Sequence, residues 1–223
     1  MRIPPVPFNV YLLLLAAAVL LLFVQVGLLS IAFEKLGLSM GSALLLLIVS
    51  LAGSAVNLPL FQLRTATFPE QPPLPPPLDS LWKMPHWEQE GRTVIALNVG
   101  GGLVPLLFSA YLMGYHTLPL SEVGIAVAGV TAISYTFSRP VPGLGIGMPM
   151  LIAPLSAALI ATVIRADQSA PLAYICGTLG VLIGADLLRL KDIRNLGAPL
   201  ASIGGAGTFD GIYLTGLVAV LLA

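Results

Sequence analysis

The chain has 223 residues, of which 57% are hydrophobic and 9% are charged, and its formal net charge is zero. Soluble domains carry about 25% charged residues, and the mean hydropathy here is +0.96. The composition therefore excludes an ordinary soluble domain and predicts an integral membrane protein. The balanced charge gives no indication of nucleic acid or of an acidic partner.

The apolar runs predict an all-α fold of about seven transmembrane helices, forming one membrane domain over residues 1–223. A helix needs about 20 apolar residues to cross a hydrocarbon core roughly 30 Å thick. The first run is too long for a secretory signal, so we expect it to be retained as a span. Six spans with one re-entrant segment is the alternative. The seven predicted spans are 9–33, 40–62, 93–115, 119–138, 143–164, 171–190 and 199–222.

The basic residues predict an orientation for these spans. With seven crossings, eight basic residues fall on one side of the membrane and two on the other. Lys and Arg are enriched in cytoplasmic loops, so we expect a cytoplasmic N-terminus and an outside C-terminus in the cytoplasmic (inner) membrane. The cytoplasmic group comprises Arg2, Arg64, Lys83, Arg92, Arg139, Arg189, Lys191 and Arg194, and the outside group comprises Lys35 and Arg165.

The longest predicted loop, residues 63–92, lies on the cytoplasmic side. Its first part, TFPEQPPLPPPLDS, is dense in proline and should be extended. A spacer is favoured there over a ligand for a proline-binding domain. The second part, LWKMPHWEQEG, contains Trp82 and Trp87, which are typical of a segment lying at headgroup level.

Cysteine and histidine give no indication of a metal centre. The single Cys176 cannot form an intrachain disulfide. His86 and His116 are the only histidines, and the predicted topology puts them on opposite sides of the bilayer. We therefore predict neither a metal nor a cofactor.

Several predicted spans combine glycine with proline or a polar residue, as in GSAVNLPL (53–60), NVGGGLVPLL (98–107), PGLGIGMPMLIAP (142–154) and SIGGAGTFDG (202–211). Glycine can let helices pack closely, or it can break a helix so that freed backbone groups line a site. Close packing is favoured for PGLGIGMP, and both interpretations stay open for NVGGGLVP and SIGGAGTFDG. The candidate substrate-binding residues are Asn57, Asn98, Gly204, Gly205 and Gly207.

Two acids, Asp186 in LIGADLLRL and Asp210 in SIGGAGTFDG, fall inside predicted spans. A charge at the membrane centre costs at least ~2.5–3.5 kcal/mol, so such residues are often functional. From a helical rise of ~1.5 Å per residue, Asp186 lies roughly 6 Å and Asp210 roughly 10 Å from the cytoplasmic boundary. Similar depths on helices joined by a short loop predict that the two carboxylates are neighbours.

Two facing carboxylates can share one proton. One then acts as a base on water while the other donates to a carbonyl oxygen. The leading prediction is therefore an intramembrane aspartyl hydrolase, a protease or peptidase, with Asp186 and Asp210 as catalytic residues. In an alternative, Asp210, Asn57 and Asn98 bind an ion or substrate in a small transporter or channel.

Two further alternatives are less specific. Asp186 could pair with Arg189 or Lys191 near the headgroups, and the whole chain could be a non-catalytic scaffold or assembly factor. The expected partners are the lipid bilayer and a membrane-protein or peptide substrate, with no nucleic acid. The sequence leaves the oligomeric state open.

Four motifs carry a family resemblance: GSAVNLPL, NVGGGLVPLLFSAYL, GADLLRLKDI and SIGGAGTFDGIYLTG. Together they resemble a family of bacterial and archaeal membrane proteins known as domain of unknown function 1614. The resemblance runs from the second predicted span to the end of the chain and implies no particular activity.

A weaker likeness is to presenilin-like intramembrane aspartyl proteases and to prepilin peptidases, which imply paired aspartates, the second in a Gly-x-Gly-Asp signature. Here Thr208 and Phe209 separate Gly207 from Asp210. Ala185 stands where presenilin-like enzymes have the Tyr of Tyr-Asp, and residues 198–200 read Ala-Pro-Leu rather than Pro-Ala-Leu.

Overall fold

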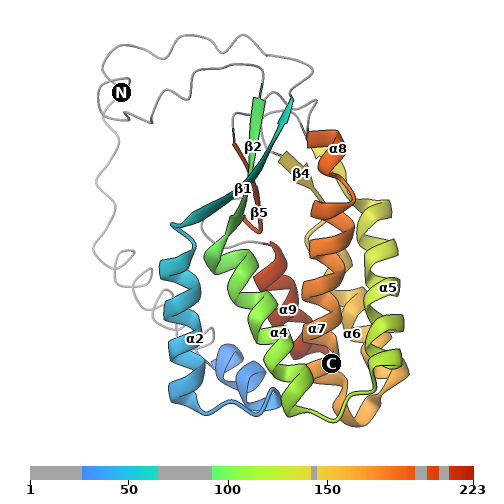
Figure 1. Ribbon diagram of the computed structural model, residues 1–223. Coiled ribbons are helices and arrows are strands. Elements are labelled where there is room, and N and C mark those ends of the chain that lie inside the picture. The colour runs from blue at the N-terminus through green and yellow to red at the C-terminus, as the bar shows by residue number, and fades with distance from the viewer. Residues whose placement is uncertain (1–26, 65–91, 142–144, 194–199, 206–210) are drawn as a thin grey trace, which may run out of the picture.

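The computed structural model describes residues 27–64, 92–141, 145–193, 200–205 and 211–223 (Figure 1). A short helix, Gly27–Lys35, precedes a bundle of helices that lie side by side. Successive bundle helices run in opposite directions between the same two ends. They are α2 (Met40–Gly53), α4 (Val104–Tyr115), α5 (Leu120–Phe137), α6 (Ile152–Ile164), α7 (Ser169–Val181) and α9 (Gly211–Leu222).

Strands gather at one end of the bundle, which we call the sheet end (Figure 1). A three-stranded sheet has the order β1-β2-β5, formed by β1 (Asn57–Arg64), β2 (Arg92–Asn98) and β5 (Leu200–Ile203). β1 is antiparallel to β2, with Asn57 opposite Asn98, and β5 is parallel to β2. A small antiparallel pair, β3 (Arg139–Val141) and β4 (Gly145–Gly147), lies at the same end.

The opposite end, which we call the far end, is joined by contacts between loops and helix termini. Lys35 Nζ donates to Val220 O (3.3 Å), near the end of α9. Ser169 Oγ donates to Ala223 O (3.2 Å), and Gln168 Nε2 donates to Thr117 Oγ1 (3.3 Å). These bonds connect the start of α7 with the end of α9 and with the α4–α5 turn.

The all-α prediction is correct for most of the described chain and wrong for the strands. The predicted span 119–138 coincides with α5 to within one residue at each end, and residues 171–187 of the predicted span 171–190 lie in the helical run Ala166–Leu187. The predicted spans 40–62, 93–115, 143–164 and 199–222 are each part helix and part strand. In β2 the apolar run has no alternating pattern that would separate it from a helix. The first span lies mostly outside the described residues, as does most of the predicted loop 63–92.

Proline positions explain why these apolar runs change from strand or loop to helix where they do. Pro105, Pro154 and Pro171 each fall in the first turn of α4, α6 or α7. At the start of α6, Pro154 costs no hydrogen bond, because a first-turn N–H has no intrahelical partner. Pro105 and Pro171 follow helical turns that lead directly into α4 and α7. These prolines mark helix starts and do not break the spans in the middle.

Two π-helical turns and two short helices complete the fold. η1 (Val99–Leu103) leads into α4, and η3 (Leu182–Leu187) extends α7 at the sheet end. A 3-10 turn, η2 (Ala166–Gln168), precedes α7, and α8 (Leu190–Ile193) follows η3. π-Helical turns often occur at functional sites, and both of these lie beside the three-stranded sheet.

The helix α7 is the centre of the bundle and packs against α4, α5, α6 and α9. Tyr174 is fully buried and meets Phe108 edge to face, with ring centroids 5.0 Å apart. Gly177 and Gly216 let α7 and α9 approach closely, since a Cβ on Gly216 would lie 2.9 Å from Thr178 Oγ1.

Two described helices, Leu120–Phe137 and Ala166–Leu187, are long and apolar enough to cross a membrane. A third results if Gly27–Lys35 and Met40–Gly53, which meet at 107°, form one span. The shorter apolar helices Val99–Tyr115 and Ile152–Ile164 lie in the same bundle. The protein is therefore a mostly helical chain with helices of membrane-spanning character.

Candidate functional site

The side chain of Asn98 joins three segments at the sheet end. Asn98 is the last residue of β2 and only 2% exposed. Its Nδ2 donates to Ser54 O (2.8 Å) and to Asn57 Oδ1 (3.1 Å). Its Oδ1 accepts from Gly101 N (2.8 Å) and so caps η1. Because both amide hydrogens and the oxygen are engaged within the chain, Asn98 supports the site and has no donor left for a ligand.

Asn57 and Ser202 extend this network across the sheet. Asn57 Oδ1 also accepts a short bond of 2.5 Å from Ser202 Oγ, on β5. The side chains of Asn57, Asn98 and Ser202 therefore connect all three strands of the sheet, at the ends of the strands that lie nearest the helices. Asn57 is exposed, so its amide nitrogen is the part of the network open to a ligand.

Glycines let backbones meet beside this network. A Cβ on Gly100 would overlap Ser50 O and Ser54 N, at the end of α2. Ser50 Oγ also donates to Gly100 O (2.7 Å), which fixes η1 against α2. Gly204 has a φ of +71°, and a Cβ there would lie 2.6 Å from Gly102 N. Both the positive φ and the close approach require glycine at position 204.

Asp186 enters the same region from η3. Its side chain is half-buried, and Oδ2 accepts a hydrogen bond of 3.3 Å from Gly204 N. The next glycine, Gly205, would bring a Cβ within 3.2 Å of Asn98 Cβ. The structure thus brings together Asp186, Asn57, Asn98, Gly204 and Gly205, which lie far apart in the sequence. Gly207 and Asp210 lie outside the described residues.

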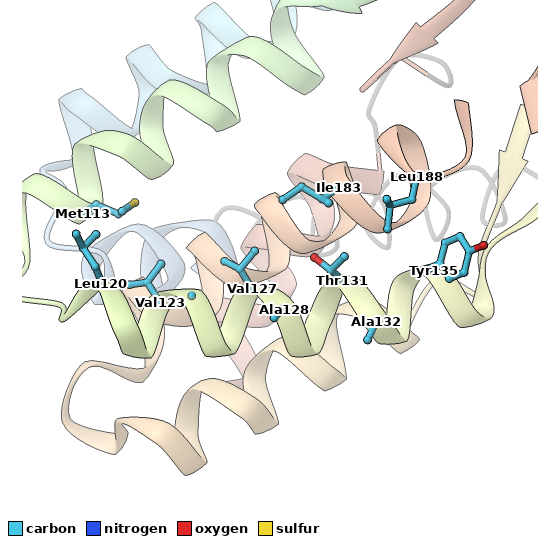
Figure 2. A pocket seen from close by; sticks show the side chains of 11 residues that line it. Met113, Leu120, Val123, Val127, Ala128, Thr131, Ala132, Tyr135, Ile183 and Leu188 are labelled. Atoms are coloured by element: carbon cyan, nitrogen blue, oxygen red, sulfur yellow. The ribbon is translucent and has the colours of Figure 1, made fainter. Parts of the chain in front are cut away.

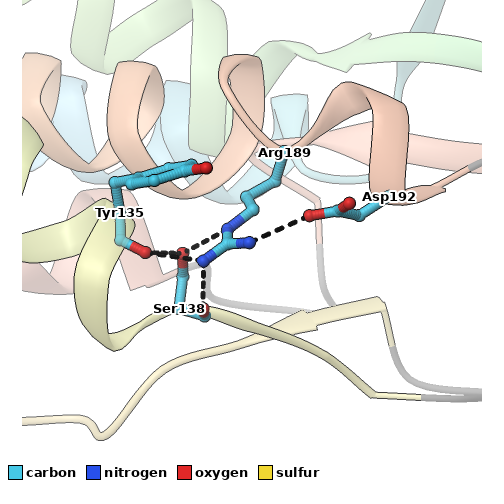
Figure 3. Close-up of polar contacts among 4 residues, drawn as sticks. All are labelled: Tyr135, Ser138, Arg189 and Asp192. Carbon is cyan, nitrogen blue, oxygen red and sulfur yellow. Dashed lines mark hydrogen bonds and ion pairs between the residues drawn. The ribbon is translucent and has the colours of Figure 1, made fainter.

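Arg189 is engaged away from Asp186, at the C-terminal end of α5 (Figure 3). Its NH1 pairs with Asp192 Oδ2 (3.0 Å), and its NH2 donates to Tyr135 O (2.8 Å) and Ser138 O (2.9 Å). Nε bonds Ser138 Oγ (3.2 Å), and the guanidinium lies 4.2 Å from the centroid of the Tyr135 ring. Arg189 therefore pairs with Asp192, and the predicted alternative in which it pairs with Asp186 is wrong.

Metal ligation finds no support in the described part of the chain, where no group of three or more His, Cys, Asp or Glu could hold an ion. His116 ends α4 at the far end, and Cys176 is a buried free thiol in α7. His86 lies outside the described residues.

Sequence reasoning missed three participants of this region: Ser50, Ser54 and Ser202. Ser202 directly precedes the glycines of SIGGAG, so its place in that motif was a usable signal. Ser54, the C-cap of α2, stands in the motif GSAVNLPL. Ser50 carried no signal, because a serine in an apolar helix most often bonds its own backbone.

Residues 51–222 match the model of a family described as "Protein of unknown function (DUF1614)". No curated protein matches the chain. No solved structure matches it either.

Proposed function

The chain belongs to the family described as a protein of unknown function (DUF1614), and since that description names no activity, we propose one from the site. We propose that the protein is a multi-pass membrane protein with an aspartyl hydrolase site at its sheet end. Asp186 and Asp210 form the catalytic pair, and the substrate is a peptide segment of a membrane protein.

The arrangement of helices and charges supports the membrane placement. The six bundle helices alternate in direction, and a preceding N-terminal span would make seven crossings. Large apolar side chains on the outside of the bundle, such as Leu45, Ile48, Ile125, Leu159 and Val163, are exposed as lipid contact requires. Helices of 12–14 residues are only about 20 Å long, which is shorter than a hydrocarbon core of about 30 Å.

The described basic residues favour a cytoplasmic sheet end. Those at the sheet end are Arg64, Arg92, Arg139, Arg189 and Lys191, and those at the far end are Lys35 and Arg165. This asymmetry supports the positive-inside orientation. The proposed location is the cytoplasmic (inner) membrane, with the N-terminus in the cytoplasm and the C-terminus outside.

One observation carries the proposed pairing of the acids. Ile212 and Ala185 belong to the same buried cluster at the sheet end. Ala185 directly precedes Asp186, and Ile212 follows Asp210 by two residues. Two residues of extended chain span at most ~7 Å, so Asp210 is tethered close to the cluster that contains Ala185, and we propose that its carboxyl group reaches Asp186.

The chemistry follows from a shared proton. One carboxylate removes a proton from water as its oxygen attacks the peptide carbonyl carbon, and the other, protonated, donates to the carbonyl oxygen. The resulting diol collapses as a proton passes to the leaving nitrogen and the C–N bond breaks. Gly204 holds Asp186 through its N–H, and Gly205 packs against Ser202 and Asn98. The exposed Asn57 faces the substrate, and Asn98 holds the strands in place.

A disulfide test measures the proposed proximity directly. In a Cys176→Ala background, the double variant Asp186→Cys/Asp210→Cys should form a disulfide under mild oxidation, because bridged Cα atoms lie about 4.4–6.8 Å apart. The matched control, Asp192→Cys/Asp210→Cys, keeps the same partner position and should stay reduced. Equal or absent cross-linking in both pairs would end the paired-aspartate proposal.

Activity tests the chemistry. Purified protein in liposomes should cleave members of a panel of fluorogenic single-span peptides. Asp186→Asn and Asp210→Asn should each abolish cleavage, while Asp192→Asn should keep it. Saturable uptake that requires Asp210, without cleavage, would instead favour the transporter. Function that survives both Asn variants but not changes in residues 63–92 would favour the scaffold.

A further inference from the structure

A long apolar groove runs along α5, between α4 and the end of α7 (Figure 2). Its volume is about 700 Å³. Met113 and Leu120 line it toward the far end, and Tyr135 and Leu188 line it toward the sheet end. Val123 and Val127 point into it from α5 in Figure 2. The groove is separate from the aspartate region, and its lining is almost wholly apolar.

The size of the groove favours a single hydrocarbon chain over a protein helix. From Leu120 to Tyr135 the groove follows about 22 Å of helix. A helix of that length and about 10 Å across would fill on the order of 1,700 Å³, more than twice the groove volume. Sites of about 300–1,000 Å³ are typical of small apolar ligands. A helix could rest on the rim of the groove but could not enter it.

The charges at the two ends differ in a way that orients such a ligand. Arg189 stacks on Tyr135 at the sheet end, and Arg139 and Lys191 are exposed nearby in sequence. Against these three cations stand two acids: Asp192, which pairs with Arg189, and the half-buried Asp186, which accepts from Gly204 N. At the far end Glu122 pairs with Arg165, beside a second acid, Asp167. The sheet end therefore attracts an anion and the far end does not.

We propose that this groove binds one acyl chain of an anionic phospholipid, with its headgroup at the sheet end beside Arg139 and Lys191. Anionic lipids of the cytoplasmic leaflet are attracted to such basic positions. The inference rests on the proposed membrane placement and does not depend on the aspartate chemistry.

Gly124 offers a clean way to fill the groove. It lines the groove, and a Cβ there would meet nothing within 4 Å. Gly124→Leu should therefore occupy ligand space without a clash, and leucine favours the helix. Gly114, on α4, is equally open but does not line the groove, so Gly114→Leu is the matched control.

Native mass spectrometry of the full chain in non-ionic detergent tests the inference. With phosphatidylglycerol and phosphatidylcholine of identical acyl chains, we expect one phosphatidylglycerol to be retained several-fold more than phosphatidylcholine. Gly124→Leu should lose that lipid and Gly114→Leu should keep it. Arg139→Gln/Lys191→Gln should remove the preference for phosphatidylglycerol while leaving chain binding intact.

Several outcomes would overturn the inference. Equal lipid retention in Gly124→Leu and Gly114→Leu would exclude the groove as the site. Dimers that disappear in Gly124→Leu would identify the occupant as a second copy of the chain. Release from membranes by alkaline carbonate would reject the bilayer placement itself, whereas loss of peptide cleavage with lipid binding intact would reject only the hydrolase.

Discussion

The two ends of the bundle are held together by different interactions. At the sheet end, backbones touch through glycine, and the buried Asn98 links α2, β1 and η1 with uncharged hydrogen bonds. At the far end, Glu122 and Arg165 form an ion pair whose side chains are 31% and 26% exposed. Water can replace the far-end ion pair, whereas Asn98 is 2% exposed and its bond to Gly101 N is buried. Substitutions at the sheet end should therefore cost more stability.

The largest effect is expected at Gly100. In Gly100→Ala the new methyl group overlaps backbone atoms of Ser50 and Ser54, which cannot rotate away. Overpacking of this kind costs about 1–3 kcal/mol and occasionally more, and we expect the upper end of that range. Circular dichroism during thermal unfolding in detergent measures it.

Gly114→Ala is the control for this substitution, because its Cβ meets nothing within 4 Å. It should leave stability unchanged or raise it by up to ~1 kcal/mol through helix propensity. If the Gly100→Ala and Gly114→Ala variants unfold at the same temperature, the close approach of η1 to α2 is not a feature of the folded protein.

The second-largest loss of stability is expected at Asn98. Asn98→Ala leaves Gly101 N–H and Ser54 O without their buried partner, and a buried unsatisfied group costs about 1–3 kcal/mol. We expect a loss of about 2–3 kcal/mol in the free energy of unfolding. Asn57→Ala, at an exposed position of the same network, should cost about 1 kcal/mol or less. Equal costs would mean that water reaches Asn98.

The sequence predicted which polar residues of this region lie near one another better than it predicted their local structure. Asn57, Asn98 and Asp186 stood out because a polar group inside an apolar run needs a partner. That argument holds whether the run is a helix or a strand. The described residues do bring these three side chains to one end of the bundle.

The strands could not be predicted by the same reasoning. In β2, the run TVIAL is apolar on both faces, so it shows no alternation. The sequence nevertheless marks the point where β2 ends and the helix begins, since Asn98 caps η1 and Pro105 stands in the first turn of α4. An N-cap Asn followed by an early proline indicates the start of a helix. The length rule for membrane spans instead predicts one continuous helix over 93–115. The pairing of β5 with β2 depends on contacts between distant segments, which periodicity does not report.

A smaller effect is expected at Arg189, where charge and geometry can be separated. Arg189→Lys keeps the positive charge but loses the planar set of donors that bonds Tyr135 O, Ser138 and Asp192. We expect a loss of about 1–2 kcal/mol in the free energy of unfolding. Lys191→Arg is the control, because Lys191 is exposed, and it should stay within about 0.5 kcal/mol of the parent. If Arg189→Lys is also neutral, only the charge of residue 189 matters.

The smallest effect is expected at the far end, and its dependence on salt distinguishes the two ends most directly. The hydrogen bond and charge of Glu122 raise the pKa of Arg165, so this arginine stays charged at every pH where the protein is handled. Glu122→Gln should lower the melting temperature slightly in dilute buffer and not at all in 1 M salt, where the screening length is about 3 Å. Asn98→Ala should cost the same in both, because its bonds are buried and uncharged. A salt-sensitive Asn98→Ala, or a Glu122→Gln effect that persists in 1 M salt, would show that the two ends are stabilised by the same kind of interaction.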